Sequence, residues 1–197
     1  MKYTYNIEVG VDECARGVLF GRIYAAAVIW PTIPNEKDKL ITDSKKLTKK
    51  KRELLYDYIK ERAIDYKVCY YDAKTVDEKG IQWCNMTLFH DCIDQLKVTP
   101  TFILVDGTQF KSHETIPHIC IKKGDSKYIS IAAASILAKV EHDRWIEEIC
   151  QENESYIKYG LLTNMGYGTK KHIEAIQEYG YCDLHRRSYK LKKLKTK

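Results

Sequence analysis

Residues 101–107 (TFILVDG) form a short, β-branched and almost wholly apolar run that ends at Asp106. Such a run predicts a buried central strand with a carboxylate at its C-terminal tip. Towards the N-terminus, residues 3–11 (YTYNIEVGV) and 22–30 (RIYAAAVIW) predict two further strands, paired as a hairpin. The first of these strands ends at Asp12, so two predicted strands lead directly into an acidic residue.

The remainder of the chain alternates between helical and strand-like patterns. Helices are predicted over residues 48–63, 81–96, 128–150 and 169–178, strands over 66–71 and 118–121, and loops over 31–44 and 160–168. The longest helix has a small and apolar first half (ISIAAASILA), which predicts burial, and a charged second half. Two strands followed by helices alternating with strands predict an α/β fold, in which helices flank both faces of a mixed sheet.

The composition is that of an ordinary globular protein, because 44% of the 197 residues are hydrophobic and 30% are charged. This length suits one compact domain with a small C-terminal addition, and no apolar run reaches the length of a membrane span. The seven cysteines are odd in number and none has C-x-x-C spacing. This argues against a disulfide framework or a cysteine zinc site, and it predicts a reducing, cytoplasmic location without a signal peptide.

Basic residues are concentrated in two segments, although the formal net charge is only +6. These segments are residues 45–52 (KKLTKKKR) and residues 186–197 (RRSYKLKKLKTK). Both are compatible with a polyanionic partner. The alternative is that one is a solvated helix face and the other a frayed tail.

Four carboxylates lie at or just beyond the ends of predicted strands, namely Asp12, Glu13, Asp106 and Asp125. If these strands are parallel neighbours, their tips converge on the crevice side of the sheet, where ligands bind in open α/β folds. Carboxylates at close range raise each other's pKa unless a cation lies between them. Oxygen ligands suit Mg²⁺, and the lack of His and Cys in this group argues against zinc.

Each of these acids also has an ordinary structural explanation. Strand-end acids are common turn residues, and Asp125, which precedes a predicted helix, is a natural helix cap. Adjacent residues of a strand point to opposite faces, so Asp12 and Glu13 share one site only if the chain leaves strand geometry there. Gly17 and Gly21 are compatible with such a turn.

Five ordered motifs resemble those of the ribonuclease HII family, the type 2 ribonucleases H. VGVDECARG is similar to the family's D-E-x-G-R-G opening, DSKKLTKKKRELLYDYI to its D-S-K-K-L loop and helix, and ILVDG to its strand with the third acid. KKGDSKYISIAAASILAKVEHD resembles the K-G-D block and its helix, and MGYGTKKHIEAIQEYGYCDLHRRSY resembles the G-Y-G-T … H-R-R-S-F ending. The resemblance therefore runs nearly end to end.

The resemblance implies a ribonuclease H-like catalytic core over residues 1–153, with a small helical extension and basic tail over residues 154–197. It implies an endonuclease that hydrolyses the RNA strand of RNA–DNA hybrids and cuts 5′ to ribonucleotides embedded in duplex DNA, leaving 3′-hydroxyl and 5′-phosphate ends. The implied catalytic and metal-binding residues, for two Mg²⁺ or Mn²⁺ ions, are Asp12, Glu13, Asp106 and Asp125. We expect the enzyme to act as a monomer on these nucleic-acid duplexes.

The resemblance also implies which residues bind the substrate. Ala15, Arg16, Gly17 and Tyr167 match the segments that recognise the ribose 2′-hydroxyl, the group that distinguishes RNA from DNA. Ser44, Lys45 and Lys46 match phosphate contacts, which would position the duplex. Asp143 also matches a family position, and we expect a structural role for it.

One departure from the family pattern bears on specificity. Ala15 stands where the family has the first glycine of its G-R-G segment, so a methyl group lies where a ribose is expected. Either the backbone angle suits alanine, or the grip on the 2′-hydroxyl is loosened and single embedded ribonucleotides are cut less well.

Three other functions are compatible with parts of this pattern. The type 3 ribonucleases H carry an extra N-terminal domain. We expect no such domain here, because the first acid is already residue 12. A noncatalytic nucleic-acid-binding module would not need all four acids. An integrase-like nuclease would not need the ribose-sensing segment.

Overall fold

Five strands form one sheet in the order β3-β2-β1-β4-β5. The computed structural model describes residues 7–191. The strands are β1 (Glu8–Cys14), β2 (Ile23–Ile29), β3 (Asp65–Tyr71), β4 (Phe102–Asp106) and β5 (His118–Ile121). The α-helices are α1 (Lys49–Arg62), α2 (Ala73–Lys79), α3 (Ile81–Asp94), α4 (Ile129–Glu152), α5 (Leu161–Asn164) and α6 (Lys170–Tyr179). Four short 3₁₀ helices are η1 (Glu36–Leu40), η2 (Ser44–Lys46), η3 (Gly124–Ser126) and η4 (Glu154–Tyr159).

The pairing of the strands brings three C-terminal ends to the same edge of the sheet. β1 is antiparallel to β2 but parallel to β4, and β4 is parallel to β5. The hairpin of β1 and β2 and the mixed sheet are therefore as predicted. Because parallel strands end on the same side, the residues that follow β1, β4 and β5 are neighbours.

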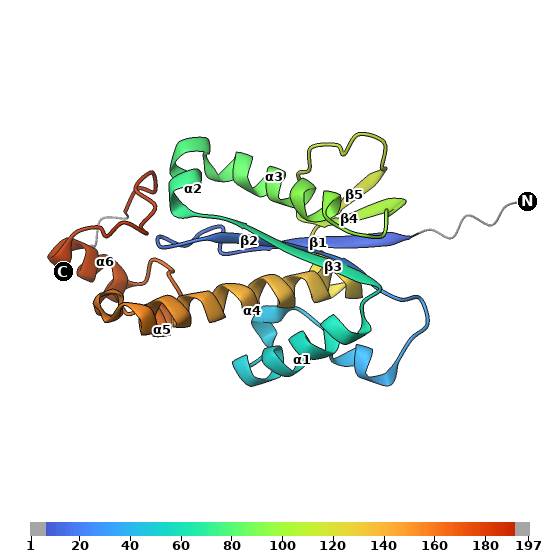
Figure 1. Cartoon of the computed structure of the whole chain (residues 1–197), viewed down its shortest axis with the longest axis horizontal. Coiled ribbons are helices and arrows are strands. Elements are labelled where there is room, and N and C mark those ends of the chain that lie inside the picture. The colour runs from blue at the N-terminus through green and yellow to red at the C-terminus, as the bar shows by residue number, and fades with distance from the viewer. Residues whose placement is uncertain (1–6, 192–197) are drawn as a thin grey trace, which may run out of the picture.

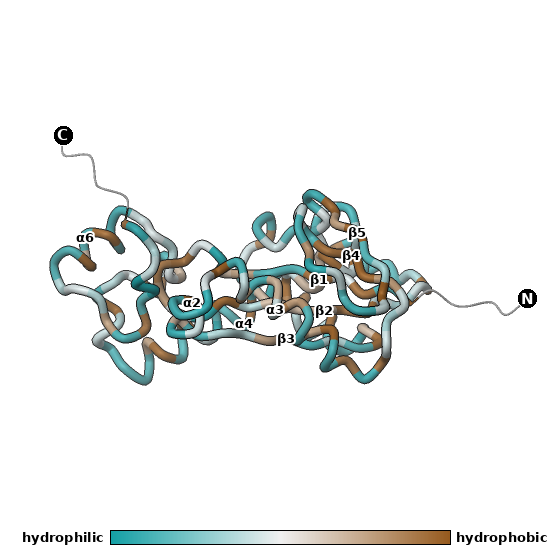
Figure 2. The backbone as a smooth tube through the Cα atoms, turned by 90° about the horizontal axis from the view of Figure 1, so that it is seen from above, coloured by the Kyte–Doolittle hydropathy of each residue, from teal (hydrophilic) through white to brown (hydrophobic). Residues whose placement is uncertain are grey.

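Helices cover both faces of this sheet, as predicted. Figure 1 shows α3 on one side of the strands, with α4 and α1 on the other. The core is correspondingly divided into two apolar layers, one between the sheet and α4 and one between the sheet and α3. Figure 2 shows hydrophobic residues concentrated around the labelled strands, whereas much of the periphery is hydrophilic.

α4 crosses the sheet in direct contact with β1. A side-chain carbon built at Gly10 would lie only 2.4 Å from the backbone nitrogen of Ile131. Only glycine allows this approach, because any other residue would force the helix away from the strand. The close contact fixes α4 beside the C-terminal end of β1, where Asp12 lies.

The segment after α4 lies at one end of the molecule, to the left in Figure 1. It contains η4, α5 and α6, and it begins after Asn153, which is both the C-cap of α4 and the N-cap of η4. Backbone bridges join this segment to the loop between β1 and β2, pairing Val18 with Tyr167 and Phe20 with His185. The segment is thus attached to the loop that follows the first acids.

Several predicted boundaries need correction. α2 was not predicted at all, because its sequence (AKTVDEK) shows little helical periodicity, and the predicted loops over residues 31–44 and 160–168 contain η1 and α5. The beginning of the first predicted strand, residues 3–6, and the end of the basic tail, residues 192–197, lie outside the described residues. Within residues 7–191, no helix combines the length and apolar character needed to cross a membrane. All seven cysteines are free thiols.

Candidate active site

Asp12 and Glu13 are consecutive residues of β1, opposite Ala26 and Ala25 of β2. The prediction that this strand ends at Asp12 is wrong, because its pairing with β2 continues to Cys14. Asp12 is buried, 5% exposed, and its carboxylate accepts a hydrogen bond of 2.7 Å from the Glu13 amide. The expected departure from strand geometry is therefore absent at this point.

Both carboxylates nevertheless reach the same edge of the sheet. β4 ends at Asp106, one residue after the partner of Val11, so on the side away from β2 no described strand continues beside β1 at Glu13. The side of β1 that faces β4 is therefore open from this position onwards. A long side chain such as that of Glu13 can turn around this open edge towards Asp12.

Asp106 and Asp125 are brought together by a tight turn. The Gly124 amide donates a hydrogen bond of 2.6 Å to the Asp106 carboxylate, which ties the tip of β4 to η3. Asp125 lies within η3, and the N-cap of α4 is Tyr128, which makes no side-chain capping bond. The alternative explanation of Asp125 as the helix cap is therefore wrong.

Mutual repulsion shows that the acids form one electrostatic cluster. Burial, Glu13 and Asp106 raise the pKa of Asp12 well above its ordinary value, and burial together with Asp106 raises the pKa of Glu13. Burial, Asp43 and Asp106 raise the pKa of Asp125. We did not predict from the sequence that Asp43, the first residue of the D-S-K-K-L motif, contributes to the negative charge around Asp125.

The donor chemistry of this cluster fits hard divalent cations. Carboxylate oxygens are the preferred ligands of Mg²⁺ and Mn²⁺. The neighbouring Cys14 is buried, which raises the pKa of its thiol to about 12, so it stays protonated and is a poor metal ligand. Within residues 7–191 no three His, Cys, Asp or Glu side chains already stand in a formed metal-binding arrangement. The four acids are thus a cluster by electrostatics rather than a completed coordination shell.

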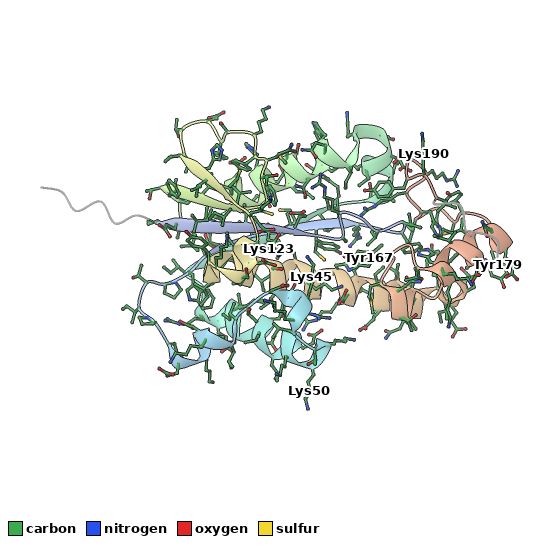
Figure 3. The ribbon with its side chains drawn as sticks, turned by 180° about the vertical axis from the view of Figure 1, so that it is seen from behind. Lys45, Lys50, Lys123, Tyr167, Tyr179 and Lys190 are labelled. Carbon is green, nitrogen blue, oxygen red and sulfur yellow. The ribbon has the colours of Figure 1, made fainter. Side chains whose placement is uncertain are left out.

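A pocket of about 380 Å³ adjoins the acidic cluster. It is lined by Glu13, Cys14, Ala15, Arg16, Ser44, Lys45, Ser135, Lys139 and Tyr167. Figure 3 shows the labelled Lys45 and Tyr167 on the same side of the molecule. Five of the seven residues predicted to bind substrate line this pocket. Gly17 and Lys46 do not, and both are exposed beside it.

Ala15 adopts a left-handed backbone conformation with a φ of 65°. This conformation strains any residue with a side chain, so the first of the two alternatives, a backbone angle that suits alanine, is not what the structure shows. The residue as a whole is only 2% exposed. Next to it, the Arg16 guanidinium donates a hydrogen bond of 2.8 Å to Gln82 of α3.

Tyr167 presents its ring to the pocket and is 39% exposed. Burial and the neighbouring groups Cys14 and Asp143 raise the pKa of its phenol to about 12, so the hydroxyl stays protonated and can donate a hydrogen bond. The Lys139 ammonium lies 5.8 Å from the centre of the ring. A flat ring beside a cation can contact both a sugar and its phosphate.

The predicted phosphate contacts differ in their surroundings. Ser44 is 4% exposed, and its hydroxyl is hydrogen-bonded at 2.9 Å to that of Ser135 of α4. Lys45 and Lys46 are exposed. The two lysines are available to a ligand, whereas Ser44 connects its loop to α4.

Asp143, for which we expect a structural role, lies in a buried ion-pair network whose partners the sequence did not predict. Its carboxylate binds the Lys139 ammonium at 2.7 Å and the Arg52 guanidinium at 3.2 Å. Arg52 also donates to the carbonyl oxygens of Ser44 and Leu47. Asp143 thus holds both the Ser44 loop and the cation beside Tyr167, and only its match to a family position could have indicated it.

Comparison with known proteins gives consistent matches. A family model described as Ribonuclease HII matches residues 9–192. The ribonuclease HII of Christiangramia forsetii is 43% identical over 190 residues, covering 95% of this chain and 93% of that protein. The structure of ribonuclease H2 from Pyrococcus horikoshii OT3 has a TM-score of 0.77 at 26% identity, covering 93% of this chain and 94% of that one. Bst-RNase HIII, solved in complex with Mn²⁺, shares the fold with a TM-score of 0.65 at 20% identity, covering 88% of this chain and 63% of that one.

Proposed function

The chain belongs to the ribonuclease HII family of endonucleases, and we propose that it hydrolyses the RNA strand of RNA–DNA hybrids and cuts 5′ to ribonucleotides embedded in duplex DNA. The products carry 3′-hydroxyl and 5′-phosphate ends. One observation carries this proposal. Glu13, which is electrostatically coupled to Asp12 and Asp106, lines the same pocket as Tyr167, Lys45 and Lys139.

Asp12, Glu13, Asp106 and Asp125 would hold two Mg²⁺ or Mn²⁺ ions, and Mn²⁺ is the ion in the solved ribonuclease HIII that shares the fold. When bound, such ions activate water and stabilise the leaving oxygen of an in-line displacement at phosphorus. Burial is the larger cause of the raised pKa values of Asp12, Glu13 and Asp125, and their mutual repulsion adds to it. That repulsion favours a cation, because a positive charge among the carboxylates relieves it. Burial of Asp12 also keeps its orientation constant.

The pocket beside the acidic cluster suits a ribonucleotide. Lys45 and Lys139 attract the phosphate backbone, and such contacts fix the register of the duplex. The protonated Tyr167 packs against the ribose, while backbone groups of Ala15, Arg16 and Gly17 bind its 2′-hydroxyl. Recognition of that hydroxyl is what separates a ribonucleotide from DNA.

Cleavage of four labelled duplexes with Mg²⁺ or Mn²⁺ tests the function. We expect cuts in RNA–DNA and in DNA with one ribonucleotide, and none in all-DNA or all-RNA duplexes. Asp12→Asn should abolish cutting, whereas Asp57→Asn, which changes an exposed acid of α1, should not. Protein that leaves both ribonucleotide-bearing duplexes intact with either ion would overturn the proposal.

Three further parts of this proposal concern the division of the chain, its oligomeric state and its location in the cell. We place the catalytic core in residues 1–153 and assign residues 154–197 to an extension packed on it. We also propose that the enzyme acts as a monomer in the cytoplasm. Sedimentation of the purified protein tests whether it is a monomer, and fractionation of cells tests whether it lies in the cytoplasm.

A further inference from the structure

The loop between β1 and β2 lies between two stretches of the C-terminal segment. The Leu19 amide donates to the carbonyl of Gly166, and the Arg186 amide donates to the carbonyl of Leu19, both at 2.8 Å. The Gly21 amide donates to the carbonyl of Leu184, also at 2.8 Å. The loop therefore behaves as a central strand whose neighbours come from the far end of the chain.

Arg186 is fully buried beneath this loop. Its guanidinium donates to the carbonyl oxygens of Gly21 at 2.9 Å and Arg16 at 3.0 Å. The Tyr189 hydroxyl donates to the same Arg16 oxygen at 2.6 Å. Since a peptide unit is planar and trans, fixing the Arg16 carbonyl also fixes the direction of the Gly17 amide, which points the opposite way.

The burial of Arg186 is energetically unfavourable on its own. Among the described residues no carboxylate forms an ion pair with it. One of its nitrogens has no hydrogen-bond partner, and burial lowers its pKa. Asp77 of α2 anchors the neighbouring backbone by accepting from the amides of Arg187 and Ser188 at 2.8 and 2.9 Å. The chain thus keeps a buried cation whose acceptors are two carbonyls of the loop and one tyrosine hydroxyl.

The preceding residue, His185, reaches the other side of the pocket through a buried chain of hydrogen bonds. The Cys182 amide donates to Nδ1 of His185 at 3.0 Å, which leaves the proton of the neutral ring on Nε2. That nitrogen lies 3.1 Å from Nε2 of His172, whose Nδ1 lies 2.9 Å from the carbonyl oxygen of Tyr167. His172 therefore donates to Tyr167.

We propose that the dipeptide His185–Arg186 positions both halves of the sugar-binding surface, Arg186 holding the Arg16–Gly17 peptide and His185 holding Tyr167 through His172. These are positioning residues, because neither side chain lines the pocket. The inference rests on the proposed function and deepens it. It assigns the selection of a single ribonucleotide to a segment of the chain more than 160 residues from the loop that it controls.

The two substrates respond differently to a loosened surface. A duplex with one ribonucleotide offers one 2′-hydroxyl and hence one productive register. A long hybrid offers a 2′-hydroxyl at every RNA position, so a displaced surface still meets one. The ratio of kcat/KM on the two substrates therefore reports positioning, whereas loss of folded protein lowers both values equally.

Tyr189→Phe is the decisive variant for the Arg16 half, because it removes one hydroxyl and keeps the ring. We expect kcat/KM on the single-ribonucleotide duplex to fall about 10-fold, the worth of one good hydrogen bond, and on the hybrid less than about 3-fold. The matched control is Tyr156→Phe, whose hydroxyl donates to Asp183 at 3.1 Å in the same segment. Its ratio should equal that of the wild type. Arg186→Lys should lower the ratio of single-ribonucleotide to hybrid kcat/KM further. If Arg186→Lys does not fold, Tyr189→Phe still tests the inference.

His172 tests the Tyr167 half by loss and rescue. His172→Leu removes the donor to the Tyr167 carbonyl and should lower the ratio, and His172→Gln, whose amide can donate, should restore part of it. Suppose that the wild type cuts both substrates, but the ratio of kcat/KM values is unchanged in Tyr189→Phe and in soluble His172→Leu. That result overturns this inference and leaves the proposed function standing. A wild type that is inert on both overturns the proposed function and the inference with it.

Discussion

The acidic cluster beside the pocket, called here the acidic end, and the loops of Ala15 and Tyr167 that line the pocket, called the sugar end, are built in different ways. At the acidic end, Asp12, Glu13 and Asp106 belong to strands whose backbones are hydrogen-bonded across the sheet. At the sugar end, Ala15 and Tyr167 lie on loops that pair with each other and with the C-terminal segment. The acidic end is therefore held by continuous strand pairing, whereas the sugar end combines a few backbone bonds between loops with buried side chains. Substitutions should separate chemistry from selectivity along this division.

The largest effect is expected at the acidic end. Asp12→Asn should lower kcat by about 10³-fold or more, because it removes a charge that binds the ions stabilising the reaction. The melting temperature should be equal or higher, because the substitution also removes a buried carboxylate that neighbours repel. Thermal melting and hybrid cleavage on the same preparation measure both. If the variant is inactive and its melting temperature is also much lower, then Asp12 supports the fold. In that case the acidic end does not serve chemistry alone, and the contrast with the sugar end fails.

The next effect concerns the loop of Ser44, which depends on the buried network around Asp143. Asp143→Asn leaves Arg52 and Lys139 without their partner and should lower the free energy of unfolding by about 3 kcal/mol, or roughly 6–12 °C in melting temperature. Glu174→Gln is the control, because it breaks only an exposed pair with Lys170 on α6 and should change less than about 1 kcal/mol. Equal effects of the two variants in urea unfolding would contradict the assigned role of Asp143.

Acidic pH should weaken the sugar end selectively. Burial and the neighbouring His172 lower the pKa of His185 to about 4 from its ordinary 6.5, and burial lowers that of His172. Between these values the unfolded chain binds more protons than the folded one, so stability falls as the pH falls from 6.5 to 4. The other charged groups that act on His185 are Asp183 and Arg187, which have opposite effects. We expect a loss on the order of 2 kcal/mol.

Urea unfolding at several pH values measures this loss. His185→Gln cannot take up the proton, so its stability should depend less on pH over the same window. A variant with the same pH dependence as the wild type would show that other groups are responsible. The carboxylates of the acidic end would then be tested as the source of the pH dependence of stability.

The smallest effect is expected at Ala15. In Ala15→Gly, relief of about 1–2 kcal/mol of left-handed strain opposes the loss of a buried methyl group, about 0.8 kcal/mol, and the greater freedom of the unfolded glycine chain. Stability should therefore change by less than about 1 kcal/mol. The ratio of single-ribonucleotide to hybrid cleavage should rise a few-fold, since glycine adopts this backbone conformation without strain and the backbone groups that bind the 2′-hydroxyl are then better placed. A ratio identical to that of the wild type would refute this explanation of the alanine.

Much of the acidic end could be predicted from local patterns. The apolar runs before Asp12 and Asp106 identified two strands, and the rule that parallel strands end together placed their acids at one edge. The exact end of β1 could not be predicted, because it depends on how far β2 and β4 extend beside it. Asp125 likewise resembled a helix cap until η3 and the N-cap at Tyr128 showed otherwise.

By itself, the sequence determined the mixed sheet, the helices on its two faces, the four acids and the family to which they point. These follow from periodicity and short motifs, which act over a few residues. Only the tertiary structure decided the left-handed conformation of Ala15, the burial of Asp143 and the contact of Arg186 with the Arg16 carbonyl. Such features join segments far apart in the chain, and a buried charge is recognisable only once the groups that exclude water from it have been brought around it.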